Sequence, residues 1–508
     1  MYKQDFGEKT DSAFPSLLPL WLAVFAVFVF LYGITCQQGV SWQDSGMFQL
    51  RILNADLYGR LGLALAHPLY IAAGQVLKVI PFGDLAWRLN FFSGLGMAVA
   101  LANISCVGAR LTDRRWIGLM VALMLGTAHT VWWLSTIAEV YTWSVAGLTA
   151  ELWILFNLIR EPTLKKAGGL ALVNGIGLTI HNFSLLTLPV HALLLVWLVT
   201  RDCLPGKALL VALLSYIAGG SLFIGMTISE AFSSGSLITA VKSALFSHYG
   251  EAVFNVAGMS SHPLANFGLS GLNFVSFLLP LAVVGWIFLF KRLDKTTAVV
   301  LSAITVIELL FFIRYSVPDQ FTFILPSLTM IALAAAIGIR VISEKSAAWH
   351  KAVAVLCVLS VFMPPIIYAA GPRLMEITGI DISRSRKLPY RNETRYWLKP
   401  WKHNEESAQR FVENAMEQAA PNGVIMASST AAYPLLYYNK KEKPESDVTI
   451  LYRKDFPDYN SAPEEFREQL AGRPLYIVSP VKGYAPSQLL NDAEFKKQPG
   501  EALYLVKW

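Results

Sequence analysis

The chain has 508 residues, of which 54% are hydrophobic and only 15% are charged. Soluble domains usually carry about 25% charged residues, so this chain has too few charges to cover several soluble domains. The composition excludes an ordinary soluble enzyme, a disordered scaffold and a nucleic-acid-binding protein, and the net charge of +7 mainly reports membrane topology. The four cysteines are spread singly, so no disulfide framework or zinc site is predicted. We interpret the sequence as that of a membrane protein.

Apolar runs long enough to cross a bilayer recur along the chain. A span needs roughly 20 apolar residues. The first run, Leu20–Cys36, is interpreted as a retained helix and not as a signal peptide, because its polar leader lacks a cationic start. In all, about eleven spans are predicted. The others are Trp87–Gly108, Trp116–Trp133, Thr142–Leu158, Gly168–Ile180, Phe183–Val199, Leu209–Ile228, Phe274–Phe290, Thr297–Phe312, Phe321–Val341 and Ala352–Ala370. The short pair around His181 leaves one broken hairpin as an alternative.

Basic residues in the loops orient these spans. Clusters of Arg and Lys occupy short loops, which alternate with loops that hold few basic residues. Basic loops belong in the cytoplasm. The pattern therefore predicts a cytoplasmic N-terminus and places Gln37–Ala86, Ser229–Asn273 and everything after Gly371 outside. The lack of a eukaryotic targeting signature and the compact loops favour a bacterial inner membrane, in which the C-terminal domain would be periplasmic.

The tail after Gly371 differs in composition from the rest, with many charges and no long apolar run. Residues 405–418 have helical spacing, and four short apolar runs read as strands: Val424–Met426, Val448–Leu451, Leu475–Val478 and Leu503–Val506. We predict a transmembrane domain over residues 1–370 and an extracytoplasmic α/β domain over residues 371–508.

The outer loop after the first span is too long for a connector and too apolar for a free loop. Met47–Leu57 and Leu69–Val79 suit helices that lie in the membrane interface. Asp44 comes just before the first of these, where a short acidic residue is typical of a helix N-cap. Taken alone, the position favours a cap.

Short motifs in a fixed order change that interpretation. They are Asp44-Ser45-Gly46, His67-Pro68, Ala86–Asn90, Glu139–Thr142, Gly177–Asn182, Tyr315–Pro326 and Pro389–Asn392. In this order they resemble the multi-spanning glycosyltransferases of the GT-C superfamily, and most closely the protein O-mannosyltransferase-like membrane proteins. There are two departures: Met47 stands where the family pattern usually has Glu, and the His-Pro run is contracted. A second acidic function in that loop is therefore missing or supplied elsewhere.

The resemblance implies an active site at the outer membrane face, a polyprenyl-phosphate sugar donor and inversion at the anomeric carbon. Such chemistry needs a carboxylate to take the proton of an acceptor hydroxyl, on the face opposite the leaving group. Asp44 is the candidate catalytic base. The acceptor would be a protein hydroxyl, a lipid or a glycan.

The leaving group is a lipid phosphate, which cationic donors at the headgroup level would stabilise. Arg88 and Arg314 fall at outer ends of spans and are the candidate phosphate-binding residues. The alternative for each is headgroup snorkelling.

Further ionisable residues also fall at the outer edge. Glu139, His181 and His67 are candidates for positioning the acceptor or, with Asp44, for holding a divalent metal ion. The alternatives are a hydrogen-bonded structural role for His181 and the start of an interfacial helix at His67, since Pro68 suits a first helical turn. Glu151 and Glu308 lie deeper, and pairing or a cavity wall is favoured for them.

The sequence as a whole predicts an integral-membrane glycosyltransferase on a mainly α GT-C-like bundle. A secondary transporter or flippase is the alternative from another class, although such proteins often show internal repeats and this chain has none. A non-catalytic relative of the same fold is the third interpretation, which the absent Glu after Asp44-Ser45-Gly46 supports.

Overall fold

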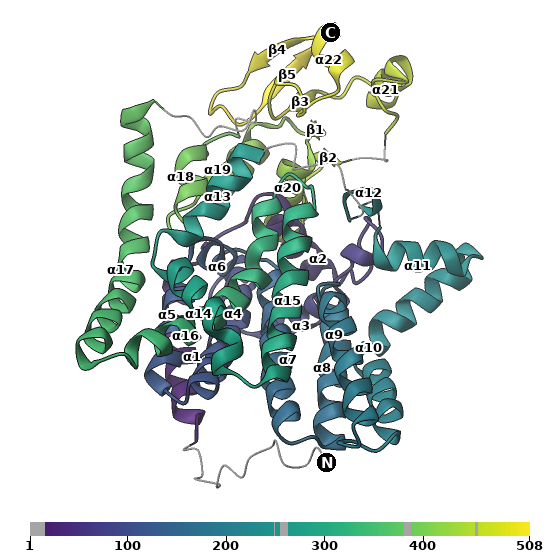
Figure 1. Ribbon diagram of the computed structural model, residues 1–508. Coiled ribbons are helices and arrows are strands. Elements are labelled where there is room, and N and C mark those ends of the chain that lie inside the picture. The colour runs from purple at the N-terminus through teal and green to yellow at the C-terminus, as the bar shows by residue number, and fades with distance from the viewer. Residues whose placement is uncertain (1–15, 248, 254–262, 380–387, 453–455) are drawn as a thin grey trace.

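The computed structural model describes residues 16–247, 249–253, 263–379, 388–452 and 456–508. Helices form a bundle, and a small α/β domain covers one end of it (Figure 1). The predicted fold class, a mainly α membrane protein with a small α/β domain, is confirmed. The predicted polar leader lies almost wholly outside the described residues.

Twelve helices make up most of the bundle. They are α1 (Leu18–Thr35), α4 (Leu85–Thr112), α5 (Arg115–Gly126), α6 (His129–Leu134), α7 (Tyr141–Arg160), α8 (Leu164–Ile180), α9 (Ser184–Thr200), α10 (Lys207–Ser234), α14 (Leu278–Arg292), α15 (Lys295–Arg314), α16 (Leu325–Ser343) and α17 (Ala347–Thr378). Within the described residues, seven helices are long and apolar enough to cross a membrane, or eight if residues 265–274 and α14, bent by 77°, form one span. The predicted total of about eleven also counts shorter helices, and that number stays a prediction.

One predicted span is broken. The run Trp116–Trp133 divides into α5 and α6 between Gly126 and His129. The side chain of Asn273 accepts a hydrogen bond of 2.8 Å from the backbone N–H of Thr130 and so satisfies a donor at the start of α6. Both halves are apolar, so hydropathy alone does not reveal the break.

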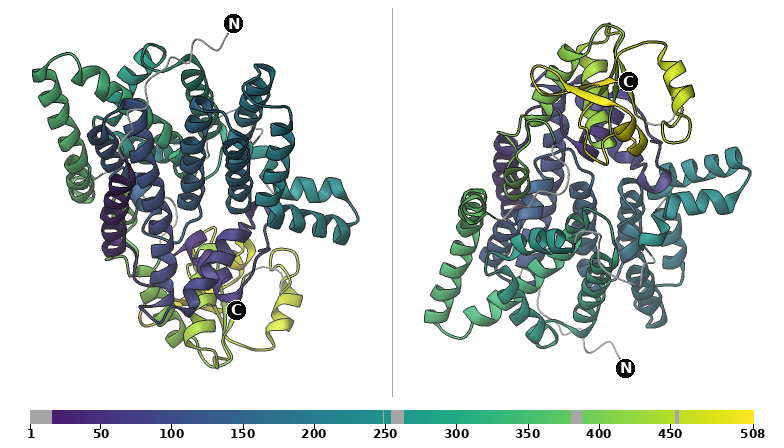
Figure 2. Two further views of the ribbon diagram at one scale, coloured as in Figure 1. Left: turned by 90° about the horizontal axis from the view of Figure 1, so that it is seen from below. Right: turned by 90° about the horizontal axis from the view of Figure 1, so that it is seen from above.

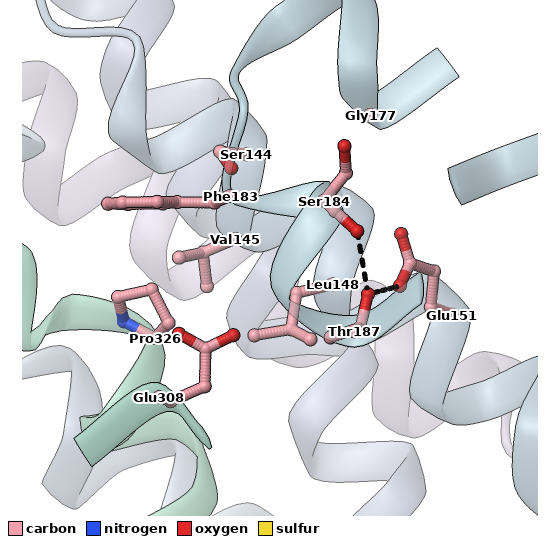
Figure 3. A pocket seen from close by; sticks show the side chains of 10 residues that line it. All are labelled: Ser144, Val145, Leu148, Glu151, Gly177, Phe183, Ser184, Thr187, Glu308 and Pro326. Atoms are coloured by element: carbon pink, nitrogen blue, oxygen red, sulfur yellow. Dashed lines mark hydrogen bonds between the residues drawn. The ribbon is translucent and has the colours of Figure 1, made fainter. Parts of the chain in front are cut away.

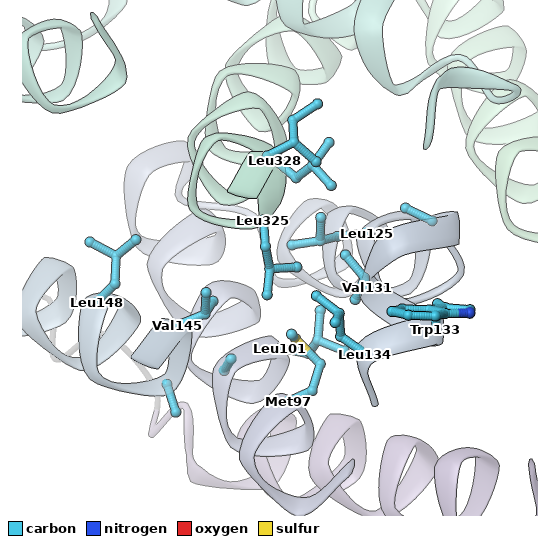
Figure 4. Packing of buried hydrophobic residues seen from close by; sticks show 14 of the residues in the cluster. Met97, Leu101, Leu125, Val131, Trp133, Leu134, Val145, Leu148, Leu325 and Leu328 are labelled. Atoms are coloured by element: carbon cyan, nitrogen blue, oxygen red, sulfur yellow. The ribbon is translucent and has the colours of Figure 1, made fainter. Parts of the chain in front are cut away.

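Helix α16 forms the centre of the bundle. All of the residues in its most apolar stretch are buried, and Leu325 and Leu328 face side chains of α4, α5, α6 and α7 (Figure 4). Helix α14 packs on it so closely that a Cβ at Gly285 would lie 1.8 Å from the Ala334 carbonyl oxygen, and one at Gly338 would lie 1.9 Å from that of Leu281. Glycine is therefore required on both helices at this crossing.

Short helices cover the end of the bundle that carries the α/β domain. The predicted interfacial helices are present as α2 (Gln43–Asn54) and α3 (Pro68–Val76), the latter followed by a 3-10 turn at Leu77–Val79. Helices α11 (Leu237–Leu245), α12 (Gly250–Val253) and α13 (Pro263–Gly271) follow α10. Helix α11 projects from one edge of the bundle and α17 stands at the opposite edge (Figures 1 and 2).

The C-terminal domain has one five-stranded sheet in the order β2-β1-β3-β5-β4. Its strands are β1 (Val424–Met426), β2 (Thr449–Leu451), β3 (Leu475–Ile477), β4 (Glu494–Lys497) and β5 (Tyr504–Lys507), with helices α18 (Glu393–Leu398), α19 (Ser407–Gln418), α20 (Ser429–Glu442), α21 (Pro463–Leu470) and α22 (Ser487–Asp492). Strand β1 pairs in parallel with β2 and β3, whereas β5 pairs antiparallel with β3 and β4. The four predicted strands and the predicted helix are present. Strand β4 was not predicted, because its polar residues give no apolar run.

Two features connect the domain to the bundle. Helix α17 continues to Thr378, past the predicted boundary at residue 370. Helix α20 packs against α2, so the C-terminal domain lies directly over the segment that carries Asp44.

Candidate active site

Asp44 lies in the first turn of α2. It is not the N-cap: Trp42 holds that position, and no side chain caps the helix. The cap interpretation is therefore wrong, because the helix begins two residues earlier than that interpretation needs. The Asp44 side chain is exposed, which leaves its carboxyl group available to a substrate.

Only glycine fits at the third position of the Asp-Ser-Gly motif, for a steric reason. A Cβ at Gly46 would lie 2.4 Å from the Ser41 carbonyl oxygen and 3.2 Å from Cδ of Pro434 on α20. The Ser41 carbonyl therefore requires glycine here, and Pro434 of the C-terminal domain adds a second tight contact. Two residues before the motif, the Trp42 indole N–H donates a 2.8 Å hydrogen bond to Ser407 Oγ of α19. The C-terminal domain thus contacts the chain on both sides of Asp44.

Asn90 fixes the loop before α2 to the bundle. Its amide group is buried and donates to the carbonyl of Gln37 at 3.0 Å. Its oxygen accepts from Gln49 Nε2 at 2.9 Å, from Ser41 Oγ at 3.1 Å and from the backbone N–H of Ala138 at 3.0 Å. A fully satisfied buried network of this kind gives the site a defined shape.

Glu139 is buried beside α2 and is held at three points. The Ser45 hydroxyl donates to its carboxylate at 2.9 Å. Ser93 of α4 accepts from the Glu139 backbone N–H at 2.7 Å and donates to its carbonyl at 2.9 Å. Glu139 thus connects the Asp-Ser-Gly motif to the second span.

Three carboxyl groups act on one another in this region. Desolvation, and then the charge of Asp319, raises the pKa of Asp44 to about 7. Burial, and then the charge of Asp44, holds the pKa of Glu139 well above its usual range, with Asp319 contributing in the same sense. Like charges that lie near one another disfavour ionisation of each other. The cluster thus holds fewer charges at neutral pH than its three carboxyl groups would carry in water.

His67 and His181 stack beside this cluster. Their ring centroids are 5.0 Å apart and the rings are inclined by 10°. His67 Nδ1 donates to the Ile180 carbonyl at 2.9 Å, since a carbonyl only accepts, and His181 Nδ1 accepts from the Phe183 N–H at 3.1 Å. Desolvation and the charge of Arg51 lower the pKa of His67 to about 3, so this ring is neutral at pH 7.

His67 also begins α3. It is the N-cap residue, with Pro68 in the first turn and a left-handed backbone at φ 49°. The predicted helix start at His67 is confirmed. His67 and His181 connect the outer loop to the turn between α8 and α9.

The two predicted phosphate-binding arginines lie in different settings. Arg88 Nη1 donates to the carbonyls of Leu77 at 2.7 Å and of Ile80. Its guanidinium thus supports the loop between α3 and α4. Arg314 is exposed at the end of α15, five residues before Asp319. The phosphate-binding role of both residues stays a prediction.

Within the described residues, no group of three or more His, Cys, Asp or Glu side chains is placed to hold a metal ion. The carboxyl and imidazole groups named above therefore do not form a preformed metal centre. The possible divalent metal ion stays a prediction.

Glu151 and Glu308 line one small cavity inside the bundle (Figure 3). Its volume is about 10 Å³, close to the space one water molecule needs. Glu151 accepts from Thr187 Oγ1 at 2.8 Å and from Asn174 Nδ2 at 3.1 Å. Both acids thus form part of a cavity wall, as predicted. Phe183 lines the same cavity and packs against His181, which separates the cavity from the outer cluster.

Several residues of the site were not singled out from the sequence. Asp319, Asn90, Ser45 and Ser93 act through packing and hydrogen bonds between distant segments. Ser45, Asn90 and Asp319 lie inside the motifs that carry the family resemblance, and this position could have identified them. Ser93 carries no sequence signal that distinguishes it from other span serines.

Comparison with solved structures identifies the fold. The chain is similar to ArnT from Cupriavidus metallidurans bound to undecaprenyl phosphate, with a TM-score of 0.56, 11% identity and coverage of 96% of this chain and 97% of that one. The apo state of the same protein matches with a TM-score of 0.54 and 12% identity over the same shares. An oligosaccharyltransferase from Archaeoglobus fulgidus in the apo form matches over 90% of this chain and 69% of its own, at 12% identity and a TM-score of 0.46. The chain has the fold of the GT-C glycosyltransferases.

A comparison with protein families finds one model that matches part of the chain. Residues 63–203 match the family model described as the protein O-mannosyl-transferase TMEM260 N-terminal domain. The resemblance inferred from the motifs is therefore confirmed: over residues 63–203 the chain is similar to this protein O-mannosyl-transferase family, and its fold is that of the GT-C glycosyltransferases. The matched segment contains His67, Arg88, Glu139 and His181. A search of curated proteins finds no match.

Proposed function

We propose that this protein transfers a sugar from a polyprenyl-phosphate donor to an acceptor on the membrane face that carries the C-terminal domain, with inversion at the anomeric carbon. The observation that carries the proposal is Asp44: an exposed carboxyl group with a pKa of about 7, between the membrane bundle and the C-terminal domain.

Asp44 would serve as the general base. As the bond between sugar and phosphate breaks, the acceptor oxygen bonds to the anomeric carbon and gives its proton to the Asp44 carboxylate. A base with a pKa near the working pH combines a useful ionised fraction with a strong tendency to accept the proton. Desolvation and the charge of Asp319 keep the pKa of Asp44 high, and the hydrogen bond from Ser45 to Glu139 holds α2 against the bundle.

The donor class is supported by the neighbouring structure, since ArnT is described as bound to undecaprenyl phosphate. The leaving lipid phosphate needs cations. Arg314 is exposed and directly precedes the loop of Asp319, and Arg88 Nη1 donates to backbone carbonyls of the loop between α3 and α4. We propose that these two arginines stabilise the lipid phosphate.

The C-terminal domain bears on the choice of acceptor, and the basic loops bear on the orientation in the membrane. Helix α20 of the C-terminal domain packs on α2, so this domain is placed to select a protein, lipid or glycan acceptor. We infer a cytoplasmic N-terminus and an extracytoplasmic C-terminal domain from the distribution of basic loops. The compact loops favour a bacterial inner membrane, in which that domain would be periplasmic. His67 and His181, neutral and stacked, would position the acceptor.

The experiment uses purified protein in lipid nanodiscs, a panel of radiolabelled polyprenyl-phosphate sugars and a membrane extract as acceptor source. The wild type is compared with Asp44→Asn and with a matched control, Asp202→Asn, which changes an exposed acid in the turn after α9. We expect label to leave the lipid with the wild type and the control but not with Asp44→Asn. Near-normal turnover by Asp44→Asn would refute the role of the base. Absence of transfer from every donor by folded wild-type protein would overturn the function and favour a transporter or a non-catalytic relative.

A further inference from the structure

A second cavity, much larger than the one inside the bundle, lies between α17 and α18. Its volume is about 620 Å³. Ala369, Arg373 and Glu376 of α17 line one side, and Asn392, Arg395 and Lys399, in and beside α18, line the other. No residue of the candidate active site lines this cavity.

The cavity is cationic. Arg373, Arg395 and Lys399 bring three positive charges to it, and Glu376 is the acidic residue among those that line it. Within the described part of the chain, no hydrogen bond or ion pair engages the side-chain nitrogens of these three residues, and Arg373 and Arg395 are exposed. Three cations around one space repel each other, and a phosphate would relieve that repulsion through charge-assisted hydrogen bonds.

An apolar stripe leads to this cavity along α17. Phe362, Ile366, Ala369, Arg373 and Glu376 follow one another at spacings of four and three residues, which places them on one face of the helix. Phe362 is 64% exposed and Ile366 is 67% exposed. At a rise of about 1.5 Å per residue, Arg373 lies roughly 10 Å beyond Ile366 along the helix.

The position of α17 exposes this stripe to lipid. The helix stands at the edge of the bundle in all three views (Figures 1 and 2). An acyl chain on Phe362 and Ile366 would bring its headgroup to the level of Arg373. Basic pockets between membrane helices are a known form of lipid headgroup site on the cytoplasmic side of membranes, and the same pairing of cations with a phosphate applies at this face.

We propose that the cavity binds the phosphate headgroup of an anionic membrane phospholipid, whose acyl chain lies along Phe362 and Ile366. Arg373 belongs to the last membrane helix, whereas Arg395 and Lys399 belong to the C-terminal domain. The bound lipid thus links the domain to the bundle. This site is additional to the proposed sugar transfer and does not depend on it.

The test measures lipid binding to the full-length protein in detergent by native mass spectrometry. The probes are phosphatidylglycerol, phosphatidylcholine and inorganic phosphate. We expect preferential binding of phosphatidylglycerol. Each Lys or Arg near a membrane surface contributes about 1 kcal/mol to the attraction of anionic lipid, which is roughly fivefold in affinity. Arg373→Gln combined with Lys399→Gln should therefore weaken phosphatidylglycerol binding roughly 25-fold and leave phosphatidylcholine binding unchanged.

The matched control is Lys351→Gln, which removes an exposed charge near the other end of α17 and should not alter binding. Ile366→Ser tests the acyl part of the site and should weaken phosphatidylglycerol without affecting inorganic phosphate. Thermal unfolding and size-exclusion profiles establish that each variant is folded. Equal binding of the two lipids, or unchanged binding by the folded double variant, would overturn the proposal. Binding of inorganic phosphate as tight as that of phosphatidylglycerol would show a free-phosphate site and likewise overturn it.

Discussion

The pH profile of sugar transfer tests whether Asp319 acts on Asp44. The pKa of Asp44 rises from an ordinary value of 3.8 to about 7, first through desolvation and second through the negative charge of Asp319. The total rise is about three pH units. Since desolvation is the larger cause, Asp319 accounts for less than half, which is less than about 1.6 pH units.

Asp319→Asn removes this charge and should keep Asp44 ionised to lower pH. A protonated carboxyl group cannot accept a proton, so the rate falls as the pH drops below the pKa of the base. The acid limb of the kcat/KM profile should therefore move to lower pH in the variant, by less than about 1.6 pH units.

The assay measures initial transfer rates between pH 5 and pH 9 at constant ionic strength. The control is Glu417→Gln, which removes an exposed acid from α19 in the C-terminal domain, and its limb should coincide with that of the wild type. An acid limb that stays at the same pH or moves to higher pH in Asp319→Asn would refute the electrostatic coupling, whatever the effect on the maximum rate.

Two further predictions concern stability. Because the folded protein raises the pKa of Asp44, ionisation of this residue opposes folding above pH 7 and has no such effect below about pH 4, where the group is protonated in both states. Asp44→Asn should therefore raise the thermal unfolding temperature at pH 8.5 but not at pH 4, and an equal gain at both pH values would contradict this sign. Ser93→Ala removes the hydroxyl that accepts from the Glu139 N–H and donates to its carbonyl, which should cost about 1–3 kcal/mol in denaturant unfolding. Ser233→Ala, at an exposed serine that bonds within its own helix, is its control and should cost far less.

The fold followed from hydropathy because each apolar run needs only local sequence to become a helix. Leu20–Cys36 and Thr297–Phe312 were placed within a few residues of α1 and α15. The division of Trp116–Trp133 was missed, since it depends on Asn273, a residue distant in sequence. Strand β4 was missed for a similar reason: it forms by pairing with β5, and its own polar residues give no strand pattern.

The candidate site was predicted only in part, for a similar reason. Asp44, Glu139 and His181 carry chemical groups at ends of predicted elements, so sequence position alone selects them. Asp319 stands in the loop before α16, and its effect on Asp44 arises only when the fold brings the two carboxyl groups near each other. No spacing rule connects two residues so distant in the chain.

This arrangement also bears on the departure at Met47. The family pattern has an acid there, and its absence left open a missing acidic function. In this protein Met47 is 8% exposed and belongs to an apolar cluster with Phe48 and Tyr70. A carboxylate in that cluster would be buried without a partner, which is costly. Glu139 and Asp319 instead bring acidic groups to Asp44 from other segments. Under the proposed function, Glu139 and Asp319 would therefore supply the acidic groups that Met47 does not, and this arrangement can be tested by the Asp319→Asn pH profile.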